Sequence, residues 1–279
     1  MPSRRGPDVP DHRDPGRSRS LRRRSFGRPR PGTRAAPPTI EKGRDRLSKN
    51  WSGAISAGDG WVLFSGASAG NSLHAHPALQ ITLAQSGRVS IVGPDGKSVS
   101  DRAILVRSGV RHRLEPHPDV QVLLVEPQTP LARYLLSATP DAPVCAVPSR
   151  LAHVLVHGPE AFLPELEPRR LDPALERALQ ALRQVEDGID VAGAARLAGV
   201  SVSRLRAIAR AELGAPLAAW LVWRKLDRAC AALTRGGRLA DAAARGGFAD
   251  QAHLTRTMRR VFGVTPGMSR SWRRAPAPA

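Results

Sequence analysis

The chain has 279 residues, with 43 Lys and Arg against 24 Asp and Glu and a formal net charge of +19. Its two cysteines, Cys145 and Cys230, lie far apart, which excludes a disulfide framework and a CxxC site and suits a reducing cytoplasm. No apolar run reaches the roughly 18 residues of a membrane span, and no apolar segment follows the basic N-terminus as in a secretory signal. We therefore expect a cytoplasmic protein of one or two domains without a membrane partner.

The positive charge is concentrated at the two ends of the chain. Residues 1–50 carry a net charge of +10, residues 51–168 a net charge of −2, and residues 169–279 a net charge of +11. A neutral middle followed by a basic C-terminal part favours phosphate contact by the C-terminal part. The alternative is that the basic surface only keeps this part soluble.

Residues 1–50 consist mainly of Arg, Pro, Gly and Ser, with almost no large apolar side chains. Such a segment cannot bury enough apolar surface to offset its ordering entropy, so we predict a disordered basic tail. Its Arg22-Arg23-Arg24 could contact DNA without sequence preference. The alternative is that translation starts downstream and that this segment is an upstream extension.

Short apolar runs separated by turns follow in residues 51–128. Gly93-Pro94-Asp95-Gly96 is a turn signal within this region. Many short strands with such turns predict a β-barrel or a jelly-roll sandwich. The predicted strands are Trp61–Phe64, Leu79–Leu83, Val89–Val92, Ala103–Val106 and Val120–Val125.

Histidines with metal-ligand spacing lie inside this predicted β-region. His74, His76 and Gln80 would share one face of a strand, because side chains alternate along it. With the later Gly-x-x-His that ends at His112, this spacing resembles the metal-binding pattern of cupins, although Gln80 replaces the usual carboxylate and Arg107 the usual Pro. The resemblance implies a divalent metal such as Zn, Fe, Ni or Cu at these four ligands. The alternatives are polar lining of an effector pocket and barrel histidines without a further role.

Residues 129–187 are predicted to form a helical connection. Pro130 is placed at the start of one helix. Leu175, Leu179 and Leu182 share one face of another helix that begins at Pro173. Such a leucine face either packs in the core or forms a dimer interface, so a homodimer is one of the expected partners.

Two stretches of the C-terminal part, residues 195–205 and residues 243–254, resemble each other. In each, an Ala is followed four residues later by Gly, then by an apolar residue, a capping residue and Leu. The first stretch predicts helices over residues 191–198 and 202–213, and the second predicts helices over residues 239–245 and 251–261.

The turn and cap residues of these stretches make two helix-turn-helix units. Gly199 and Gly247 fit the turns, where a positive φ is usual. Asp190, Ser201 and Asp250 are the predicted N-caps. A long helix that starts at Pro216 and runs to Leu233 would join the two units.

The second helix of each unit is the one that enters the major groove of DNA. Arg206 and Arg256 could contact guanine, and Gln251 could contact adenine. Arg259 and Arg260 are better placed for phosphates. The candidate DNA-contacting residues are Ser203, Arg204, Arg206, Ala207, Arg210, Gln251, Ala252, His253, Thr255, Arg256, Arg259 and Arg260.

Gly246-Gly247-Phe248-Ala249-Asp250-Gln251-Ala252-His253-Leu254-Thr255-Arg256, with Phe262-Gly263-Val264-Thr265-Pro266, resembles the C-terminal signature of AraC/XylS-type transcription regulators. The resemblance implies that two recognition helices enter successive major-groove segments of one promoter site. It also implies a cupin-like effector domain, which many members carry. Two residues depart from the family: Ala207 stands where Arg is common, and Ala209 where a large aromatic is usual.

The sequence thus predicts an α+β protein of two domains. The first is a cupin-like β-barrel or jelly roll at residues 51–128, and the second is an all-α AraC-type DNA-binding domain at residues 188–274. We expect a transcription regulator, not an enzyme, that binds double-stranded promoter DNA and responds to a small effector or a metal, with RNA polymerase as a further candidate partner. The alternatives are a cupin metalloenzyme, an oxygenase or isomerase using His74, His76 and His112, and an architectural DNA-binding protein that senses nothing.

Overall fold

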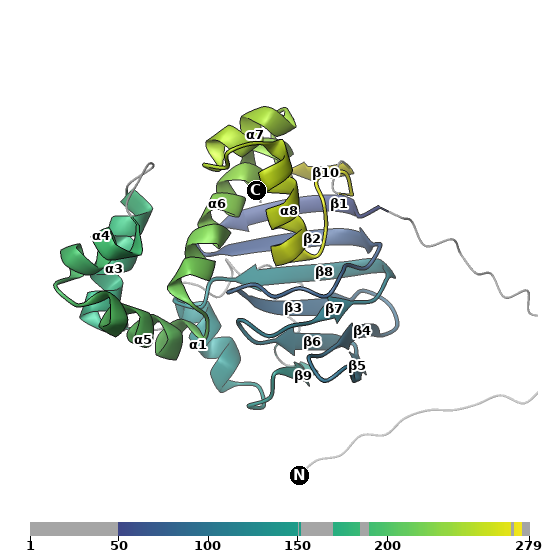
Figure 1. Cartoon of the computed structure of the whole chain (residues 1–279). Coiled ribbons are helices and arrows are strands. Elements are labelled where there is room, and N and C mark those ends of the chain that lie inside the picture. The colour runs from purple at the N-terminus through teal and green to yellow at the C-terminus, as the bar shows by residue number, and fades with distance from the viewer. Residues whose placement is uncertain (1–49, 150, 152–169, 185–189, 269–270, 275–279) are drawn as a thin grey trace, which may run out of the picture. The chain divides into compact units, whose positions relative to one another are not determined.

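Antiparallel strands make up the N-terminal half of the described chain, and helices make up its C-terminal half (Figure 1). The computed structural model describes residues 50–149, 151, 170–184, 190–268 and 271–274, which all belong to one compact unit. The two-part α+β prediction is confirmed at this level. The predicted disordered tail and much of the predicted connection, residues 152–169, lie outside the described residues.

Seven strands form the larger sheet, in the order β10-β1-β2-β8-β3-β6-β9. Neighbouring strands are antiparallel, except that β10 runs parallel to β1. Because β9 pairs with β6 and β10 with β1, both outer strands are free edges within the described part, and the sheet does not close into the predicted barrel. Its strands are β1 (Ser52–Gly58), β2 (Trp61–Ser68), β3 (Leu79–Ala84), β6 (Ala103–Val106), β8 (His117–Val125), β9 (Val144–Ala146) and β10 (Ser271–Arg274).

A smaller three-stranded sheet has the order β5-β4-β7, with β4 (Val89–Val92), β5 (Ser98–Asp101) and β7 (Arg113–Leu114). The predicted turn at residues 93–96 joins β4 to β5, and the Gly93 amide donates to the Lys97 carbonyl at 2.8 Å. The five predicted strands are all present, as β2, β3, β4, β6 and β8.

The larger sheet is buried on both faces at its centre, where every residue of β3 and β6 is buried. On one face, Ile81, Leu105 and Leu123 pack with Leu131 and Leu135 of α1 (Pro130–Ser137). On the other face, residues of the smaller sheet complete a second cluster, which includes Val89, Ile91, Ile104, Val106, Leu114 and Val120. Burial of these aliphatic side chains is the main stabilising contribution of the β-region.

The helical part follows the predicted helices closely. It consists of α3 (Pro173–Gln184), α4 (Val191–Ala198), α5 (Val202–Leu213), α6 (Leu217–Thr234), α7 (Leu239–Arg245) and α8 (Gln251–Phe262). The predicted N-caps accept backbone hydrogen bonds: Asp190 from Gly193, Ser201 from Arg204 and Asp250 from His253. The predicted turn glycines, Gly199 and Gly247, have φ values of 70° and 69°, which favour glycine over other residues.

Helix α6 connects two separate helical cores. Trp220 is fully buried in the core formed by α3, α4, α5 and the start of α6. One turn later, Trp223 belongs to a second core, formed by α6, α7 and α8 together with Ala78 from the loop before β3. No described helix is long and apolar enough to cross a membrane.

Candidate functional site

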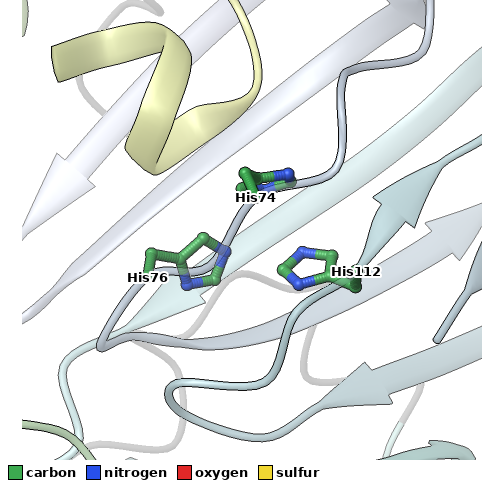
Figure 2. Close-up of side chains that lie close together, drawn as sticks. All are labelled: His74, His76 and His112. Carbon is green, nitrogen blue, oxygen red and sulfur yellow. The ribbon is translucent and has the colours of Figure 1, made fainter. Parts of the chain in front are cut away.

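His74, His76 and His112 point toward one another (Figure 2). One ring nitrogen from each lies within 4.8 Å of those of the other two, and all three side chains are buried. None of the three lies on a strand, so the expectation of a shared strand face does not apply to His74 and His76. Instead, an isolated antiparallel bridge joins the two loops: the His74 amide donates to the His112 carbonyl at 3.0 Å, and the His112 amide to the His74 carbonyl at 2.9 Å.

The three imidazoles share one orientation. In each ring, Nδ1 lies within hydrogen-bond distance of a backbone carbonyl oxygen two residues away, which can only accept. Each ring therefore carries its proton on Nδ1 and keeps a free lone pair on Nε2, the arrangement of histidines that ligate metals. The acceptors are the carbonyl oxygens of Ser72, Ala78 and Val110, at 2.9, 3.0 and 2.9 Å from His74, His76 and His112.

Gln80 completes this three-histidine cluster from β3. Its Oε1 lies 3.2 Å from Nε2 of both His76 and His112, and its Nε2 donates to Oγ1 of Thr82 at 3.0 Å. Three atoms without a hydrogen thus face one another, a convergence that a cation stabilises. A rotation of the Gln80 amide would satisfy the same groups without a cation, because its NH₂ would then donate to the rings. The orientation of the Gln80 amide therefore decides whether the cluster presents an oxygen or an NH₂ group to the rings.

Burial keeps the three histidines neutral. It lowers the pKa of His74 to about 3, with a further contribution from the neighbouring His76. Burial also lowers the pKa of His76, and it lowers the pKa of His112 well below the usual value. Neutral imidazole is the form that ligates a metal, so no proton has to be displaced from Nε2 near neutral pH.

A cavity of about 210 Å³ lies beside the cluster. His74, His76 and Gln80 contribute one part of its lining, and apolar side chains such as Phe64, Leu124 and Trp223 contribute most of the rest. Polar residues away from the three histidines and Gln80 also line it, among them Asn71, and Asp227, Thr234 and Arg235 of α6 and its C-terminal end. A mostly apolar cavity with a few convergent polar groups is typical of a small-molecule site.

The two predicted recognition helices present their candidate residues outward. Eleven of the twelve candidate DNA-contacting residues are exposed, and Thr255 is half-buried. The opposite faces are buried, at Leu205, Ile208 and Ala209 on α5 and at Leu254 and Met258 on α8. The structure thus shows a packed face and a polar, basic face on each helix.

Local contacts distinguish the candidate side chains from one another. Arg204 lies 3.9 Å from the Asp172 carboxylate, and Oγ1 of Thr255 donates to the Gln251 carbonyl at 2.8 Å. The His253 ring packs edge-on against Phe248, with centroids 5.3 Å apart. Among the described residues, Arg206 and Arg256 form no ion pair, so their guanidinium groups are available to an incoming ligand.

Sequence reasoning missed several residues around the cluster. Trp223 is buried, and its ring lies 5.9 Å from that of His76 and 5.5 Å from that of Phe262. Asn71 and Ser72 bond to residues 262 and 263, which are 191 positions away in sequence. No spacing rule connects positions so distant, so only the fold reveals these contacts.

Comparisons with known proteins identify the C-terminal part. Residues 194–271 match a family model described as a helix-turn-helix domain. No curated protein sequence matches the chain. Among solved structures, apo ToxT K231A from Vibrio cholerae is 11% identical with a TM-score of 0.52, over 75% of this chain and 96% of that one.

Two further solved structures resemble the chain. Wild-type ToxT from Vibrio cholerae with a bound unsaturated fatty acid is 10% identical with a TM-score of 0.50, over 77% of this chain and 96% of that one. A transcriptional regulator from Chromobacterium violaceum, described as containing an AraC-type DNA-binding domain, is 24% identical with a TM-score of 0.33, over 36% of this chain and 90% of that one. At these identities the likeness to ToxT establishes a shared fold.

Proposed function

Because the chain is a DNA-binding transcription regulator of the AraC/XylS type, we propose that it reads a promoter site with the exposed faces of α5 and α8. The observation that carries this proposal is the pairing of a buried and a basic face on each helix. Helix α6 has 18 residues and is therefore roughly 27 Å long. This length is of the order of the roughly 34 Å between successive major-groove segments, so α6 can serve as the spacer between the two units.

The proposed roles follow from side-chain chemistry. Arg256 and Gln251 of α8 read bases, since guanidinium matches guanine and a carboxamide matches adenine. Arg206 is the base reader of α5, where the neighbouring Ala207 offers only a methyl group. Arg259 and Arg260, in the last turn of α8, contact phosphates and set the salt dependence of binding.

A binding titration tests this proposal. The full chain is titrated onto labelled DNA from upstream of its own gene and onto random DNA, with fluorescence anisotropy at moderate salt as the readout. Arg256→Ala should lose about 1–3 kcal/mol on the specific site and less on random DNA. Arg88→Ala, an exposed cation on the sheet, is the matched control. Equal losses on both DNAs would make Arg256 a phosphate contact, and absence of specific binding by the wild type would overturn the proposal.

We propose in addition that the three-histidine cluster holds a divalent transition metal. Its support is that one ring nitrogen from each of the three buried histidines lies within 4.8 Å of the other two, and that Oε1 of Gln80 lies 3.2 Å from Nε2 of His76 and of His112. Three imidazoles with one neutral oxygen suit Zn²⁺ and similar ions, with bonds of about 2.0–2.2 Å. The ion would supply a positive charge and a Lewis-acidic centre beside the cavity.

Calorimetry with Zn²⁺ and Ni²⁺ on the purified full chain tests the metal site. The wild type should bind one ion, and His112→Ala should weaken binding at least about tenfold. Gln80→Glu should tighten binding, because an anionic oxygen is a better ligand than an amide. His253→Ala, which removes an exposed histidine, is the control. If the wild type and His112→Ala bind these ions equally, the cluster is not a metal site.

The apolar lining of the cavity favours a second candidate effector, a small apolar molecule. A protein of the same fold, ToxT, holds an unsaturated fatty acid in one of its structures. A thermal-shift titration with palmitoleic acid, with Phe64→Ala as the cavity variant, tests this class. An increase in melting temperature that Phe64→Ala abolishes supports an apolar effector, and an unchanged melting temperature of the wild type excludes it.

We propose that the two packed sheets are an open form of the cupin-like jelly roll, with His112 on the loop that leads into β7. The neutral Gln80 disfavours the cupin-enzyme alternative, so the proposed protein regulates without catalysing a reaction. RNA polymerase and a second copy of the chain are its proposed protein partners.

A further inference from the structure

We propose that the loop from Asn71 to His74 couples the three-histidine cluster to the DNA-reading helix α8, so that metal binding changes DNA affinity through the second helix-turn-helix unit. The inference rests on the proposed metal site and names how that site regulates DNA binding. Three contacts in the structure support it: a cap on α8, a close backbone approach, and a hydrogen bond from the proposed ligand His74 to the capping residue Ser72.

The loop caps the C-terminal end of α8. The amide and the hydroxyl of Ser72 both donate to the Gly263 carbonyl, at 3.0 and 3.2 Å. Nδ2 of Asn71 donates to the Phe262 carbonyl at 3.2 Å. The last carbonyls of a helix have no partner within the helix. The loop therefore supplies these partners and fixes where α8 ends.

The contact between loop and helix leaves no room for a side chain. A Cβ atom on Gly263 would lie 2.5 Å from the Ser72 carbonyl oxygen and 2.9 Å from Nδ1 of His74. Gly263 also has a φ of 70°, which disfavours other residues. The backbones of Ser72 and Gly263 are in direct contact here. If the loop shifts, the end of α8 therefore has to shift with it, or the hydrogen bonds that cap the helix have to break.

The capping residue is bonded to a metal ligand. Nδ1 of His74 donates to the Ser72 carbonyl at 2.9 Å, while the amide of the same Ser72 holds Gly263. A second connection runs through aromatic rings, from His76 to Trp223 at 5.9 Å and from Trp223 to Phe262 at 5.5 Å. Two of the three ligands are thus one or two contacts away from the end of α8.

Metal binding requires the cluster to contract. Ligand nitrogens about 2.0–2.1 Å from a tetrahedral metal lie about 3.4 Å apart. The ring nitrogens here lie within 4.8 Å of one another, so the widest pair closes by up to about 1.4 Å. Densely packed contacts pass on a displacement of this size because they shift between discrete arrangements instead of deforming continuously.

The effect is expected at the second unit, because the loop caps the end of α8 directly through hydrogen bonds. The core of the first unit, where α5 packs on α3, α4 and the start of α6, contains no residue of the loop or of the cluster. The first unit meets the His112 loop at Gly109, which lies against Gly214 at the end of α5 and donates its amide to the His76 carbonyl at 2.8 Å. That approach to α5 is a packing contact, whereas hydrogen bonds hold the end of α8. Metal binding should therefore change the contribution of Arg256 of α8 to DNA affinity and leave the contribution of Arg206 of α5 unchanged. This difference separates coupling through the loop from a general change in folding.

The test measures DNA affinity of the full chain by anisotropy, on the DNA upstream of its own gene, with Zn²⁺ and after its removal with EDTA. Calorimetry on the same samples records Zn²⁺ binding. We expect Zn²⁺ to change the wild-type dissociation constant for DNA at least about fivefold. Asn71→Asp keeps the acceptor for the Leu114 amide but places an anion against the end of α8. This variant should bind Zn²⁺ with the affinity of the wild type. Its dissociation constant for DNA should differ by less than about twofold between the Zn²⁺-loaded and the EDTA-treated protein.

Ser90→Ala, which removes a hydroxyl from the exposed β4–β5 ladder, is the control and should keep the full response. Hydrogen exchange on the wild type gives a measurement that needs no variant: Zn²⁺ should change protection at residues 259–263 and leave α5 unchanged. Zn²⁺ binding with unaltered DNA affinity overturns the coupling and leaves the metal site standing. A full response in Asn71→Asp overturns the role of the loop. No Zn²⁺ binding by the wild type overturns the metal site and this inference with it.

Discussion

The two helix-turn-helix units have similar sequences but make different contacts with the rest of the chain. The core of the first unit, α4 and α5, consists of helical residues alone and includes Trp220. The core of the second unit, α7 and α8, also contains Ala78 and contacts Leu124 of β8. Within the described residues, the second unit alone therefore shares its hydrophobic core with the sheet beside the three-histidine cluster.

The first unit reaches the sheet through polar contacts instead. The Glu126 carboxylate at the end of β8 accepts from Arg183 of α3 at 3.4 Å and from Arg224 of α6 at 3.1 Å. The backbone at Gly109 also lies against Gly214, which ends α5. The same motif is thus joined to the sheet by a shared hydrophobic core in one copy and mainly by polar contacts in the other.

The largest expected effects come from the two tryptophans of α6, one in each core. Trp220→Ala and Trp223→Ala should each lower the free energy of unfolding by about 3–5 kcal/mol, measured by urea denaturation, because both side chains are buried. Trp220→Ala should leave Zn²⁺ affinity unchanged, and Trp223→Ala should weaken it, because only Trp223 packs on His76. Equal effects of the two variants on Zn²⁺ affinity would contradict the separation of the cores.

Glu126→Gln tests the ion pairs of Glu126 with Arg183 and Arg224. The carboxylate is 4% exposed and holds two guanidinium groups that are themselves partly exposed. We expect a loss of about 1–3 kcal/mol of unfolding free energy, since Gln keeps the shape but removes the charge. Hydrogen exchange should rise in α3 and at the start of α6 and stay constant in α8. Faster exchange in α8 instead would show that Glu126 anchors the second unit.

Arg256→Ala and Arg206→Ala compare base reading by the two units. We expect the α8 variant to lose about 1–3 kcal/mol of discrimination between specific and random DNA. The α5 variant should lose less, because Ala207 beside it offers no hydrogen bond and leaves this unit with fewer base contacts. Anisotropy on both DNAs measures the difference. A greater loss for Arg206→Ala would assign the main reading role to the first unit.

Local signals explain what the sequence predicted well. The N-caps Asp190, Ser201 and Asp250 and the turn residues Gly199 and Gly247 act within four residues, so their roles can be inferred without the fold. The same holds for the apolar strands of the sheet. Five described strands were missed: β1, β5, β7, β9 and β10. Two of them, β1 with SGAISAG and β5 with SVSD, have few β-branched or aromatic residues, and β7 and β9 have only two and three residues.

The arrangement of the cluster was only partly predictable. The spacing of His74, His76, Gln80 and His112 predicted a common site, and the fold brings all four together. The capping of α8 by Asn71 and the pairing of β10 with β1 join segments at opposite ends of the described chain. Non-local pairing of this kind depends on how the whole chain packs, so it could not be inferred from local patterns.

Among these variants, Asp227→Asn should change the stability of the fold least. It tests the part of α6 that lies between the two units. Burial raises the pKa of Asp227, against the opposing effect of Arg224, and Glu126 raises it further. A raised pKa in the folded chain means that folding favours the protonated acid. The wild type therefore loses stability as pH rises from the usual value of 3.8 through the higher folded value. Asn has no charge to bury and avoids this loss.

We therefore expect Asp227→Asn to have a higher melting temperature than the wild type at pH 7 and an equal one at pH 3. Asp95→Asn, on the exposed β4–β5 turn, is the control and should match the wild type at both pH values. Because Asp227 lines the cavity beside the second core, the gain should appear in α6 and α8 by hydrogen exchange and not in α4 or α5. An equal gain of protection in both units would mean that they unfold together as one cooperative unit joined by α6. The difference between the contacts that hold the two units would then have no effect on their stability, contrary to the comparison above.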